Sequence, residues 1–321
     1  MRAAVCERYG PPEVVRIVEV PKPQPEPDEV LIRVRATTVN SGDARVRAAR
    51  VPRGVGLPFR LSMGWSAPKQ GVLGFELAGD VEAVGSRVRQ FKLEDRVIGS
   101  GGFTFRCHAE YRCIAEAGAI AIIPEGMSYP DAVALLFGGV TSLAFFGEGK
   151  LKRGEHLLVN GASGAVGVMA IQIAKHIGAE VTAVCSGSHA DLVRALGADH
   201  VIDYTQSDFT QAAETYDVIM DNHGNAPYAR VKHLLRPGGR FLLVIGDLWQ
   251  MITAGFNKAI ISTNQDGRAT NAENYRHLLD LAQRRVLKPV IDKAYPFEDI
   301  VEAHRHVDTG HKTGSVVLTL G

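Results

Sequence analysis

The sequence predicts an α/β protein with two folding units, one rich in β-strands and one built on a doubly wound parallel sheet. Three observations lead to this prediction. The chain has 321 residues, more than one ordinary hydrophobic core covers. The first 124 residues contain short runs in which apolar and polar residues alternate, whereas residues 125–266 alternate strand-like with helix-like segments.

The amino-terminal unit is expected to consist mainly of strands. β-Branched runs with a period of two indicate strands at Glu29–Thr38, Gly79–Val84 and Arg96–Ile98. The segment Pro21–Pro27 is expected to be an extended edge or a loop, because each proline lacks the amide hydrogen that a sheet needs. A Pro-Glu-Gly turn at residues 124–126 marks the end of this unit.

The middle unit repeats a strand followed by a helix, which is typical of βαβ units on a parallel sheet. The predicted strands are His156–Asn160, Glu180–Cys185, Val201–Asp203, Tyr216–Asp221, Phe241–Ile245 and Ala259–Ser262. The predicted helices between them are Val166–Ile177, Ala190–Leu196 and Tyr228–Leu235. Six short apolar strands in this order fit the Rossmann sheet that binds dinucleotides.

The carboxyl-terminal segment contains one predicted amphipathic helix, Ala272–Arg285, and one last strand, Ser315–Leu320. It is too small to fold as a domain of its own. We therefore expect it to complete the first unit, so that residues 1–124 and 267–321 form an outer domain around a domain of residues 125–266.

The composition is that of a soluble globular protein and not of a disordered or fibrous one. The chain is 45% hydrophobic and 22% charged, and 36 basic residues nearly balance 35 acidic ones, for a net charge of +1. This balance lacks the positive excess that nucleic acid attracts, so no nucleic-acid partner is expected.

The cysteines and the amino terminus favour a cytoplasmic location. None of the four cysteines forms a Cys-x-x-Cys pair, and the first residues contain no secretory signal. The longest nearly uncharged stretch, Ala132–Gly147, is shorter than the roughly 20 residues that a bilayer requires. We interpret it as a buried helix pair or an interdomain segment and expect no stable membrane insertion.

A glycine-rich turn joins the first strand and helix of the middle unit. It runs through Gly161, Ala162, Ser163, Gly164, Ala165, Val166 and Gly167. In the G-x-G-x-x-G pattern alanine takes the first glycine position, Gly164 lets the backbone approach a pyrophosphate, and Gly167 lets the helix pack on the sheet. Its place between a strand and a helix predicts a dinucleotide site, and a turn without a ligand is the alternative.

The end of the second strand favours NADPH over NADH. An acidic residue there would bond the adenosine ribose and repel a 2′-phosphate. The segment Val181–Ala190 contains no acid, and Ser186 occupies the acidic position, with Ser188 and His189 close behind. Hydroxyl and imidazole groups can donate hydrogen bonds to a phosphate, so we expect this segment to bind the 2′-phosphate of NADPH. The alternative is that these residues form a solvated loop without a ligand.

Several ordered motifs carry a family resemblance over nearly the whole chain. They are Val39–Asp43, Gly74–Gly85, Phe91–Val97, Phe137–Ser142, the glycine turn, Leu196–Tyr204 and Lys312–Leu318. Together they resemble the medium-chain dehydrogenase/reductase superfamily, in its zinc-free quinone oxidoreductase-like branch. The resemblance implies a GroES-like outer domain, a Rossmann NADP(H) domain, an active cleft between them and, usually, a homodimer.

The resemblance also implies which residues act at the nicotinamide end of the cleft. The candidate catalytic residues are Asn40, Asp43, Arg45 and Thr141. Many quinone reductases of the family have a tyrosine facing the substrate where this chain has Arg45, so the identity of the acceptor stays open. The basic run Arg45–Lys69 contains no acid and is either a lip over the substrate cleft or a surface loop.

For the cofactor, the resemblance places Ser186, His189 and Tyr204 around the 2′-phosphate. Many relatives have lysine at the position of His189, and an imidazole carries only part of a positive charge near neutral pH. Asn222 and Gly246, at the ends of later strands, are expected either to line the cofactor or to form ordinary turns.

Comparison with zinc-dependent relatives predicts that no metal is bound. Those relatives have a cysteine at the position of Asn40 or Ser41 and a histidine at the position of Phe75. Catalytic zinc requires three protein ligands, and only Glu76 remains here.

Without a Lewis acid the ionisation of an alcohol is unfavourable, whereas a quinone or an α,β-unsaturated carbonyl accepts hydride at carbon while its oxygen gains charge. The expected function is therefore zinc-independent, NADPH-dependent reduction of such acceptors. One alternative is an NAD(P)-dependent alcohol or aldehyde dehydrogenase of the same superfamily. The other is an NADPH-binding sensor or structural protein without turnover.

Overall fold

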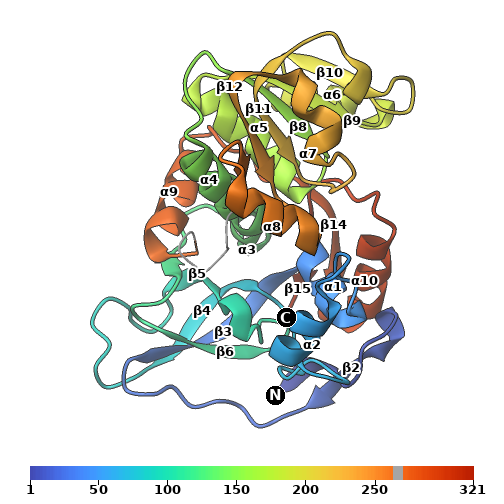
Figure 1. The fold of residues 1–321 in the computed structure, drawn as a ribbon. Helices are drawn as coiled ribbons and strands as arrows, with labels where there is room; N and C mark the ends of the chain where they lie inside the picture. The colour runs from blue at the N-terminus through green and yellow to red at the C-terminus, as the bar shows by residue number, and fades with distance from the viewer. Residues whose placement is uncertain (263–269) are drawn as a thin grey trace.

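The structure is a computed structural model that describes residues 1–262 and 270–321, and within them two domains lie one above the other (Figure 1). The lower domain contains a mixed sheet and both chain termini, and the upper domain contains a parallel sheet. The predicted α/β fold class is confirmed. The predicted domain boundary between residues 266 and 267 lies outside the described residues.

The lower sheet includes strands from both ends of the sequence. Its order is β14 (Ile291–Pro296), β15 (Ser315–Thr319), β3 (Glu29–Val39), β4 (Glu76–Val84), β5 (Arg96–Ser100) and β7 (Ile120–Ile122), and β6 (Tyr111–Ala115) also pairs with β3. A separate antiparallel pair consists of β1 (Arg2–Cys6) and β2 (Val15–Glu19). Because β15 pairs with β3 along Val316–Thr319, the carboxyl-terminal residues return to the first unit, as expected.

The upper sheet has the strand order β10-β9-β8-β11-β12-β13, which is the classical Rossmann order. Its strands are β8 (His156–Asn160), β9 (Glu180–Cys185), β10 (His200–Asp203), β11 (Tyr216–Asp221), β12 (Leu235–Leu243) and β13 (Ile260–Ile261). Helices α5 (Ala165–Ile177), α6 (Ala190–Ala195) and α7 (Tyr228–Val231) connect them. The strand order reverses between β8 and β11, where ligands bind in such sheets.

The predicted strands and helices lie within three residues of the observed bounds, except for one strand and one helix. The strand predicted at Phe241–Ile245 is β12, which begins at Leu235 and ends at Leu243. Its register with β11 moves from Tyr216↔Leu235 to Val218↔Arg240, so extra residues around Pro237 are accommodated in an irregularity. Helix α7 ends at Val231, and a 3₁₀ helix continues it over Lys232–Leu234; the helical segment stops before the predicted Leu235 because Leu235 already pairs with β11.

The apolar stretch of residues 132–147 is a buried helix pair, as predicted. It forms α3 (Tyr129–Ala134) and α4 (Leu136–Gly149), which share one hydrophobic core with residues of both sheets and of α9 (Ala272–Gln283). Among the described residues, Tyr129–Gly149 is long and apolar enough to cross a bilayer, but 67% of its most apolar window is buried inside the protein.

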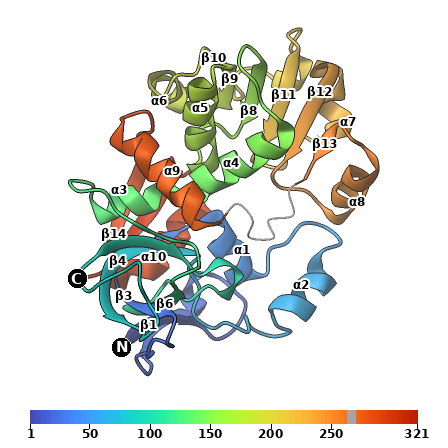
Figure 2. The same cartoon turned by 90° about the vertical axis from the view of Figure 1, so that its left-hand side faces the viewer.

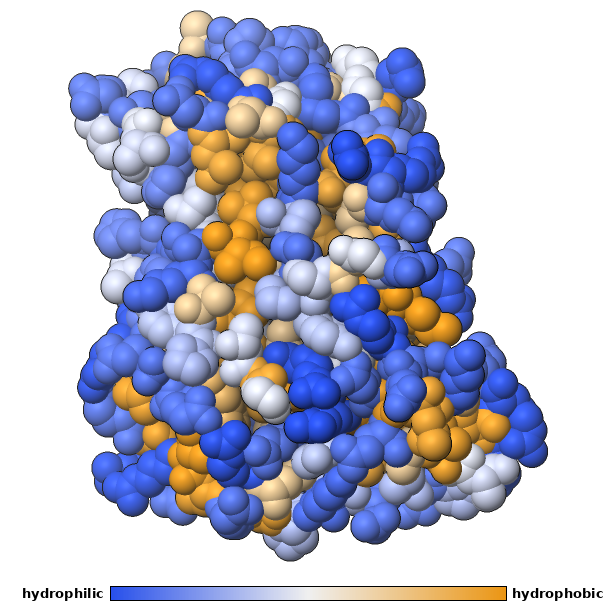
Figure 3. Space-filling view, turned by 180° about the vertical axis from the view of Figure 1, so that it is seen from behind, coloured by the Kyte–Doolittle hydropathy of each residue, from blue (hydrophilic) through white to orange (hydrophobic). Residues whose placement is uncertain are grey.

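The remaining helices surround the space between the domains. Helices α1 (Ser41–Ala48), α2 (Gly56–Met63) and α10 (Ile300–Asp308) belong to the lower domain, and α8 (Leu248–Phe256) belongs to the upper one. Figure 2 shows α2 and α8 on the same side of the molecule. The segment before α2 contacts α8 directly, because the Leu248 amide donates to the Arg53 carbonyl at 3.0 Å. The opposite face of the molecule carries a hydrophobic band that descends from the upper domain and is flanked by hydrophilic residues (Figure 3).

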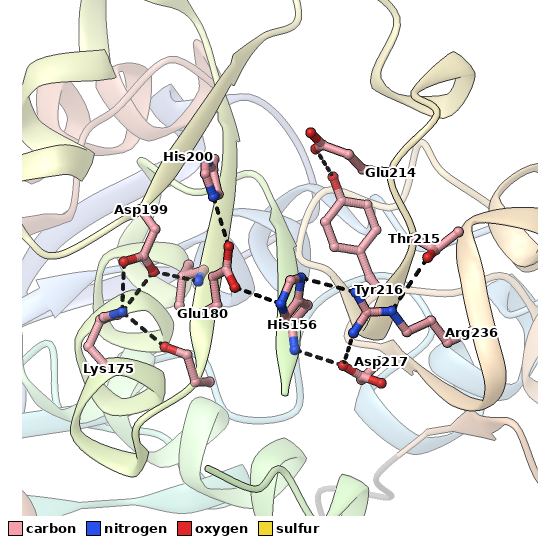
Figure 4. A network of polar contacts seen from close by, with 12 residues as sticks. His156, Lys175, Glu180, Asp199, His200, Glu214, Thr215, Tyr216, Asp217 and Arg236 are labelled. Atoms are coloured by element: carbon pink, nitrogen blue, oxygen red, sulfur yellow. Dashed lines mark hydrogen bonds and ion pairs between the residues drawn. The ribbon is translucent and has the colours of Figure 1, made fainter. Parts of the chain in front are cut away.

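A cluster of polar side chains lies at the amino ends of the parallel strands. There Glu180 pairs with both His156, at 2.6 Å, and His200, at 2.9 Å, and Arg236 pairs with Asp217 (Figure 4). The adjoining cavity has a volume of only about 160 Å³. Since ligands bind at the opposite, carboxyl ends of such strands, we interpret this cluster as a structural connection between β8, β9, β10 and β11.

Candidate functional site

A cleft of about 1870 Å³ lies between the domains, at the carboxyl ends of the upper strands. Pockets for small ligands usually measure roughly 300–1,000 Å³, so this cleft has room for a dinucleotide together with an acceptor. The predicted site residues that line it are Arg45, Thr141, Gly161, Ser163, Gly164, Ala165, Val166, Gly167, Ser186, His189, Tyr204 and Asn222. Four other predicted residues, Asn40, Asp43, Ala162 and Gly246, are buried behind its surface.

The glycine turn has the geometry that a pyrophosphate site requires. A Cβ added to Gly164 would meet only the Gly161 carbonyl oxygen, at 3.6 Å, so the space beside Gly164 is open. A Cβ added to Gly167 would lie 2.3 Å from that same oxygen and 2.5 Å from the Ala162 oxygen, so α5 packs directly on the turn. Gly161 has a φ of +76°, which favours glycine. Ala162 is fully buried and supports the turn from below, where its amide donates to Val184.

The lower domain contacts this turn through its last strand. The Gly314 amide donates to the Ser163 carbonyl at 2.8 Å, and Gly314 forms an isolated bridge with Gly164. A Cβ on Gly314 would lie 2.2 Å from the Val290 carbonyl oxygen, which accounts for the glycine of the Lys-Thr-Gly motif. Residues 312–314 therefore connect the two domains next to the expected phosphates.

The side chains expected near the 2′-phosphate form a connected group. The Ser186 hydroxyl lies 2.9 Å from the Ser188 hydroxyl and 3.0 Å from His189 Nδ1. His189 Nε2 lies 2.8 Å from the Thr313 hydroxyl of the lower domain. Tyr204 lines the same end of the cleft and is 52% exposed. The structure thus brings Ser186, His189 and Tyr204 together, and adds Thr313, which the sequence did not indicate.

The ends of β11 and β12 contribute differently from what was predicted. Asn222 follows β11 and lines the cleft, and both polar atoms of its side chain are buried without a partner among the described residues. Gly246 is buried, and a Cβ there would lie 2.7 Å from the Leu243 side chain. Val244 and Ile245, which follow the end of β12 at Leu243, line the cleft and Gly246 does not; the expected contact of Gly246 with the cofactor stays a prediction.

Asn40 and Asp43 cap the amino end of α1. The Asn40 side chain accepts hydrogen bonds from the amides of Gly42 and Asp43, and the Asp43 carboxylate accepts them from the amides of Asn40 and Gly74, at 3.0 Å each. Asp43 is fully buried, and burial raises the pKa of its carboxyl. We therefore correct its catalytic assignment to a positioning residue for α1. Asn40 Nδ2 is buried without a partner among the described residues, and Asn40 does not line the cleft.

Three phenylalanine rings, those of Phe75, Phe105 and Phe137, lie together and form what we call the aromatic wall. Phe75 takes the position at which zinc-dependent relatives have a metal ligand. The Phe75 ring lies 4.7 Å from the Phe105 ring and 6.5 Å from the Phe137 ring, and both Phe75 and Phe137 line the cleft. The adjacent Glu76 accepts a hydrogen bond from Thr38, and burial raises the pKa of the Glu76 carboxyl to about 8. Within residues 1–262 and 270–321 no group of three or more His, Cys, Asp or Glu side chains is placed to hold a metal ion.

Thr141 and Arg45 line the cleft from opposite domains. The Thr141 hydroxyl donates to the Phe137 carbonyl at 2.7 Å, so its oxygen is left as an acceptor. Arg45 comes from α1, on the face that also presents Ser41 and Gly42 to the cleft. Of the basic run Arg45–Lys69, only Arg45 and Arg50 line the cleft, and α2 has no buried residue, so most of this run is surface.

Lys312 is the cleft residue that sequence reasoning missed. Its ammonium donates to the Gly314 carbonyl at 2.7 Å, and burial lowers the pKa of this ammonium to about 8, although Asp292 and Glu76 act against the shift. Lys312 lies in a recognised motif, but nothing local in the sequence shows that β15 brings that motif to the glycine turn.

These residues fit a nicotinamide dinucleotide. The turn leaves open space beside Gly164, Lys312 supplies a positive charge close to that turn, and Asn222 presents a buried donor and acceptor without partners among the described residues. A group with phosphates at one end and an amide-bearing ring at the other would satisfy all three features.

Comparisons with known proteins agree with this geometry. The family model described as "Alcohol dehydrogenase GroES-like domain" matches residues 26–144, and the one described as "Zinc-binding dehydrogenase" matches residues 196–318. A 2-methylene-furan-3-one reductase of Solanum lycopersicum is 30% identical, with 99% of this chain and 79% of that protein covered. A chloroplastic NADPH-dependent alkenal/one oxidoreductase of Arabidopsis thaliana is 29% identical with the same coverage.

Among solved structures, the quinone oxidoreductase of Coxiella burnetii superposes with a TM-score of 0.87 at 27% identity, covering 100% of this chain and 99% of that one. The expected GroES-like and Rossmann domains are thereby confirmed. The chain belongs to the medium-chain dehydrogenase/reductase superfamily, in its quinone oxidoreductase-like branch.

Proposed function

We propose that this protein is a zinc-independent, NADPH-dependent reductase of quinones or α,β-unsaturated carbonyl compounds. The observation that carries the proposal is the pairing, in one cleft, of an open glycine turn with an aromatic wall at Phe75. The relatives named above as reducing alkenals, enones and quinones support it.

The reduced nicotinamide would supply the hydride, and the acceptor would then take a proton from water. The protein supplies position and exclusion of water. Phe75 and Phe137 offer flat apolar contacts to a conjugated acceptor and keep solvent away from it.

The choice of NADPH rests on the group around Ser186. Three side chains with hydroxyl or imidazole groups, Ser186, Ser188 and His189, occupy the place where an acid would select NADH. Lys312 adds a cation to the same end of the cleft.

The decisive experiment follows the near-ultraviolet absorbance of NADPH while a panel of quinones and enones is added to the purified protein. A reductase consumes NADPH with at least one of them. A sensor binds NADPH without consuming it, and a dehydrogenase reduces NADP⁺ when it is given alcohols. Either of these two results would contradict the proposed reductase function.

We expect the purified protein to contain no stoichiometric zinc and to keep its activity in EDTA. The reason is that Phe75 stands in place of a ligand and only Glu76 of a catalytic set remains. Elemental analysis and a chelator titration measure this. About one zinc per chain, together with loss of activity in EDTA, would contradict zinc independence.

We expect Lys312→Met to raise the Kd of NADPH by roughly 10-fold or more at pH 7, because a hydrogen bond to a charged group is lost. In the wild type the Kd should also rise as the pH increases through about 8, since the ammonium then loses its proton in the free protein. The variant should lack this rise. Titration of bound-NADPH fluorescence at pH 7 and pH 9.5 measures both effects.

Lys288→Met, at an exposed lysine that does not line the cleft, is the matched control. An unchanged Kd in Lys312→Met would remove this lysine from the cofactor site.

We also propose a cytoplasmic homodimer. The four cysteines are free and buried, which suits a reducing compartment. A second copy could cover the open edge of β13 and the neighbouring α8, where Trp249 and Phe256 are 74% and 89% exposed. Light scattering on the eluting protein and cell fractionation test the two parts.

A further inference from the structure

Two arginines at the carboxyl end of α1 share one acid, and a third arginine of the same helix, Arg45, does not pair with it. Arg47 is fully buried and pairs with one oxygen of Asp308, and Arg50 pairs with the other oxygen. Asp308 lies at the end of α10, and no ion pair joins it to Arg45 in the described part of the chain. The group of Arg45, Arg47, Arg50 and Asp308 keeps an excess of positive charge at the edge of the cleft.

Arg45 is the member of this group without a counter-ion. The described residues offer its side chain no hydrogen bond and no ion pair. Burial and the neighbouring Arg50 guanidinium both lower the pKa of Arg45, and no carboxylate acts in the opposite direction. Removing a cation from water without pairing it costs free energy, and an anionic ligand would recover that cost.

Arg45 also lies where an acceptor would be held. It lines the cleft together with Ser41, Gly42 and Phe75, and the Phe75 ring packs on Gly42, where an added Cβ would lie 3.1 Å from it. The anionic end of a dinucleotide has its own partners in the glycine turn, Ser186 and Lys312. Arg45 thus follows Gly42 by three residues on α1, so it lies on the helix face against which the Phe75 ring packs.

We propose that the acceptor carries an anionic group, such as a carboxylate, which pairs with Arg45 while its conjugated carbonyl lies on Phe75 and Phe137. This inference rests on the proposed reductase function and narrows its substrate class. A planar guanidinium holds a carboxylate through two parallel hydrogen bonds, so Arg45 would orient the acceptor as well as attract it.

The test compares two acceptors that differ only in charge, 3-benzoylacrylate and its methyl ester. We expect the wild type to favour the acid, and Arg45→Gln to reduce the acid/ester ratio of kcat/KM by roughly 10- to 150-fold, the range for a hydrogen bond to a charged group. Arg45→Lys should keep part of the preference. Arg53→Gln, at an exposed arginine of the same run that does not line the cleft, should leave the ratio unchanged.

A binding measurement separates this inference from the reductase function. Calorimetry with the wild type–NADP⁺ complex compares 3-benzoylpropionate, which cannot be reduced at a double bond, with its methyl ester. If the wild type binds the acid more tightly than the ester and Arg45→Gln loses this preference, the inference about Arg45 is supported. This holds even if neither acrylate is reduced, because the absence of reduction would contradict only the proposed reductase function.

Reduction of both acrylates with a ratio that Arg45→Gln does not change would overturn the inference and leave the reductase function intact. A loss of NADPH affinity in Arg45→Gln as large as the loss in the ratio would place Arg45 on the cofactor phosphates and would also overturn it.

Discussion

Gly164→Val should give a folded protein that no longer binds NADPH measurably. A Cβ at this position meets only one backbone oxygen, at 3.6 Å, so the side chain fits the apo protein. The same side chain would occupy the open space where the pyrophosphate has to lie. Losing two hydrogen bonds to a charged group corresponds to at least roughly 150-fold in Kd. Fluorescence titration measures the affinity, and circular dichroism with a thermal melt measures folding.

Gly167→Val is the matched control because its defect should be in folding. A Cβ there lies 2.3 Å and 2.5 Å from two backbone oxygens, which cannot move without shifting α5 or the turn. Overpacking of this kind costs roughly 1–3 kcal/mol or more. A lower Tm in Gly167→Val with a wild-type Tm in Gly164→Val would separate the two glycines. Undiminished NADPH affinity in a folded Gly164→Val protein would show that the phosphates lie elsewhere.

Ser186→Asp should shift cofactor preference from NADPH towards NADH. The Ser186 hydroxyl lies in the group with Ser188 and His189 at the tip of β9, so a carboxylate there would face the 2′-phosphate. The same carboxylate could accept hydrogen bonds from the ribose hydroxyls of NADH, so both effects act in one direction. We expect roughly 2–3 kcal/mol, or about 30- to 150-fold in the NADPH/NADH ratio of kcat/KM. Steady-state kinetics with both cofactors on one quinone measures it.

His189→Ala should shift the same ratio in the same direction by less, because it removes one contact to the phosphate and introduces no negative charge. The contact of His189 with Thr313 offers a control, since Thr313→Val removes that hydrogen bond without changing charge. An unchanged ratio in Ser186→Asp would place the phosphate away from this loop. A wild-type preference for NADH would contradict the expected preference for NADPH, on which both of these predictions depend.

Local sequence patterns were sufficient for the elements that hold the cofactor. The strands at His156–Asn160, Glu180–Cys185 and Tyr216–Asp221 have the predicted bounds, because short apolar runs between turn residues define buried parallel strands by themselves. The sequence also predicted that Gly164 leaves open space for a ligand and that Gly167 allows close packing of the helix. The spacing of the turn determines which of the two glycines has which role.

Predictions were less accurate where pairing partners decide the structure. The start of β12 at Leu235 depends on its irregular register with β11, and the strand ends at Leu243, which pairs with Asp221 at the end of β11. Register is a property of two strands together, and the periodicity of one strand does not reveal it.

The sequence by itself determined that this chain has a Rossmann domain with a glycine turn, a second β-rich domain, and no complete set of zinc ligands at the family positions, because each of these depends on residue type and local spacing. Only the tertiary structure decided what the remaining side chains do. Asp43 and Arg45 are two residues apart on one helix, yet Asp43 is buried against backbone amides while Arg45 lines the cleft. Lys312 reaches the glycine turn only because the chain before β15 returns to it, and Asp308 of α10 pairs with Arg47 and Arg50 but not with Arg45. Burial and charge pairing depend on contacts between distant segments, and a sequence pattern contains no record of which distant segments meet.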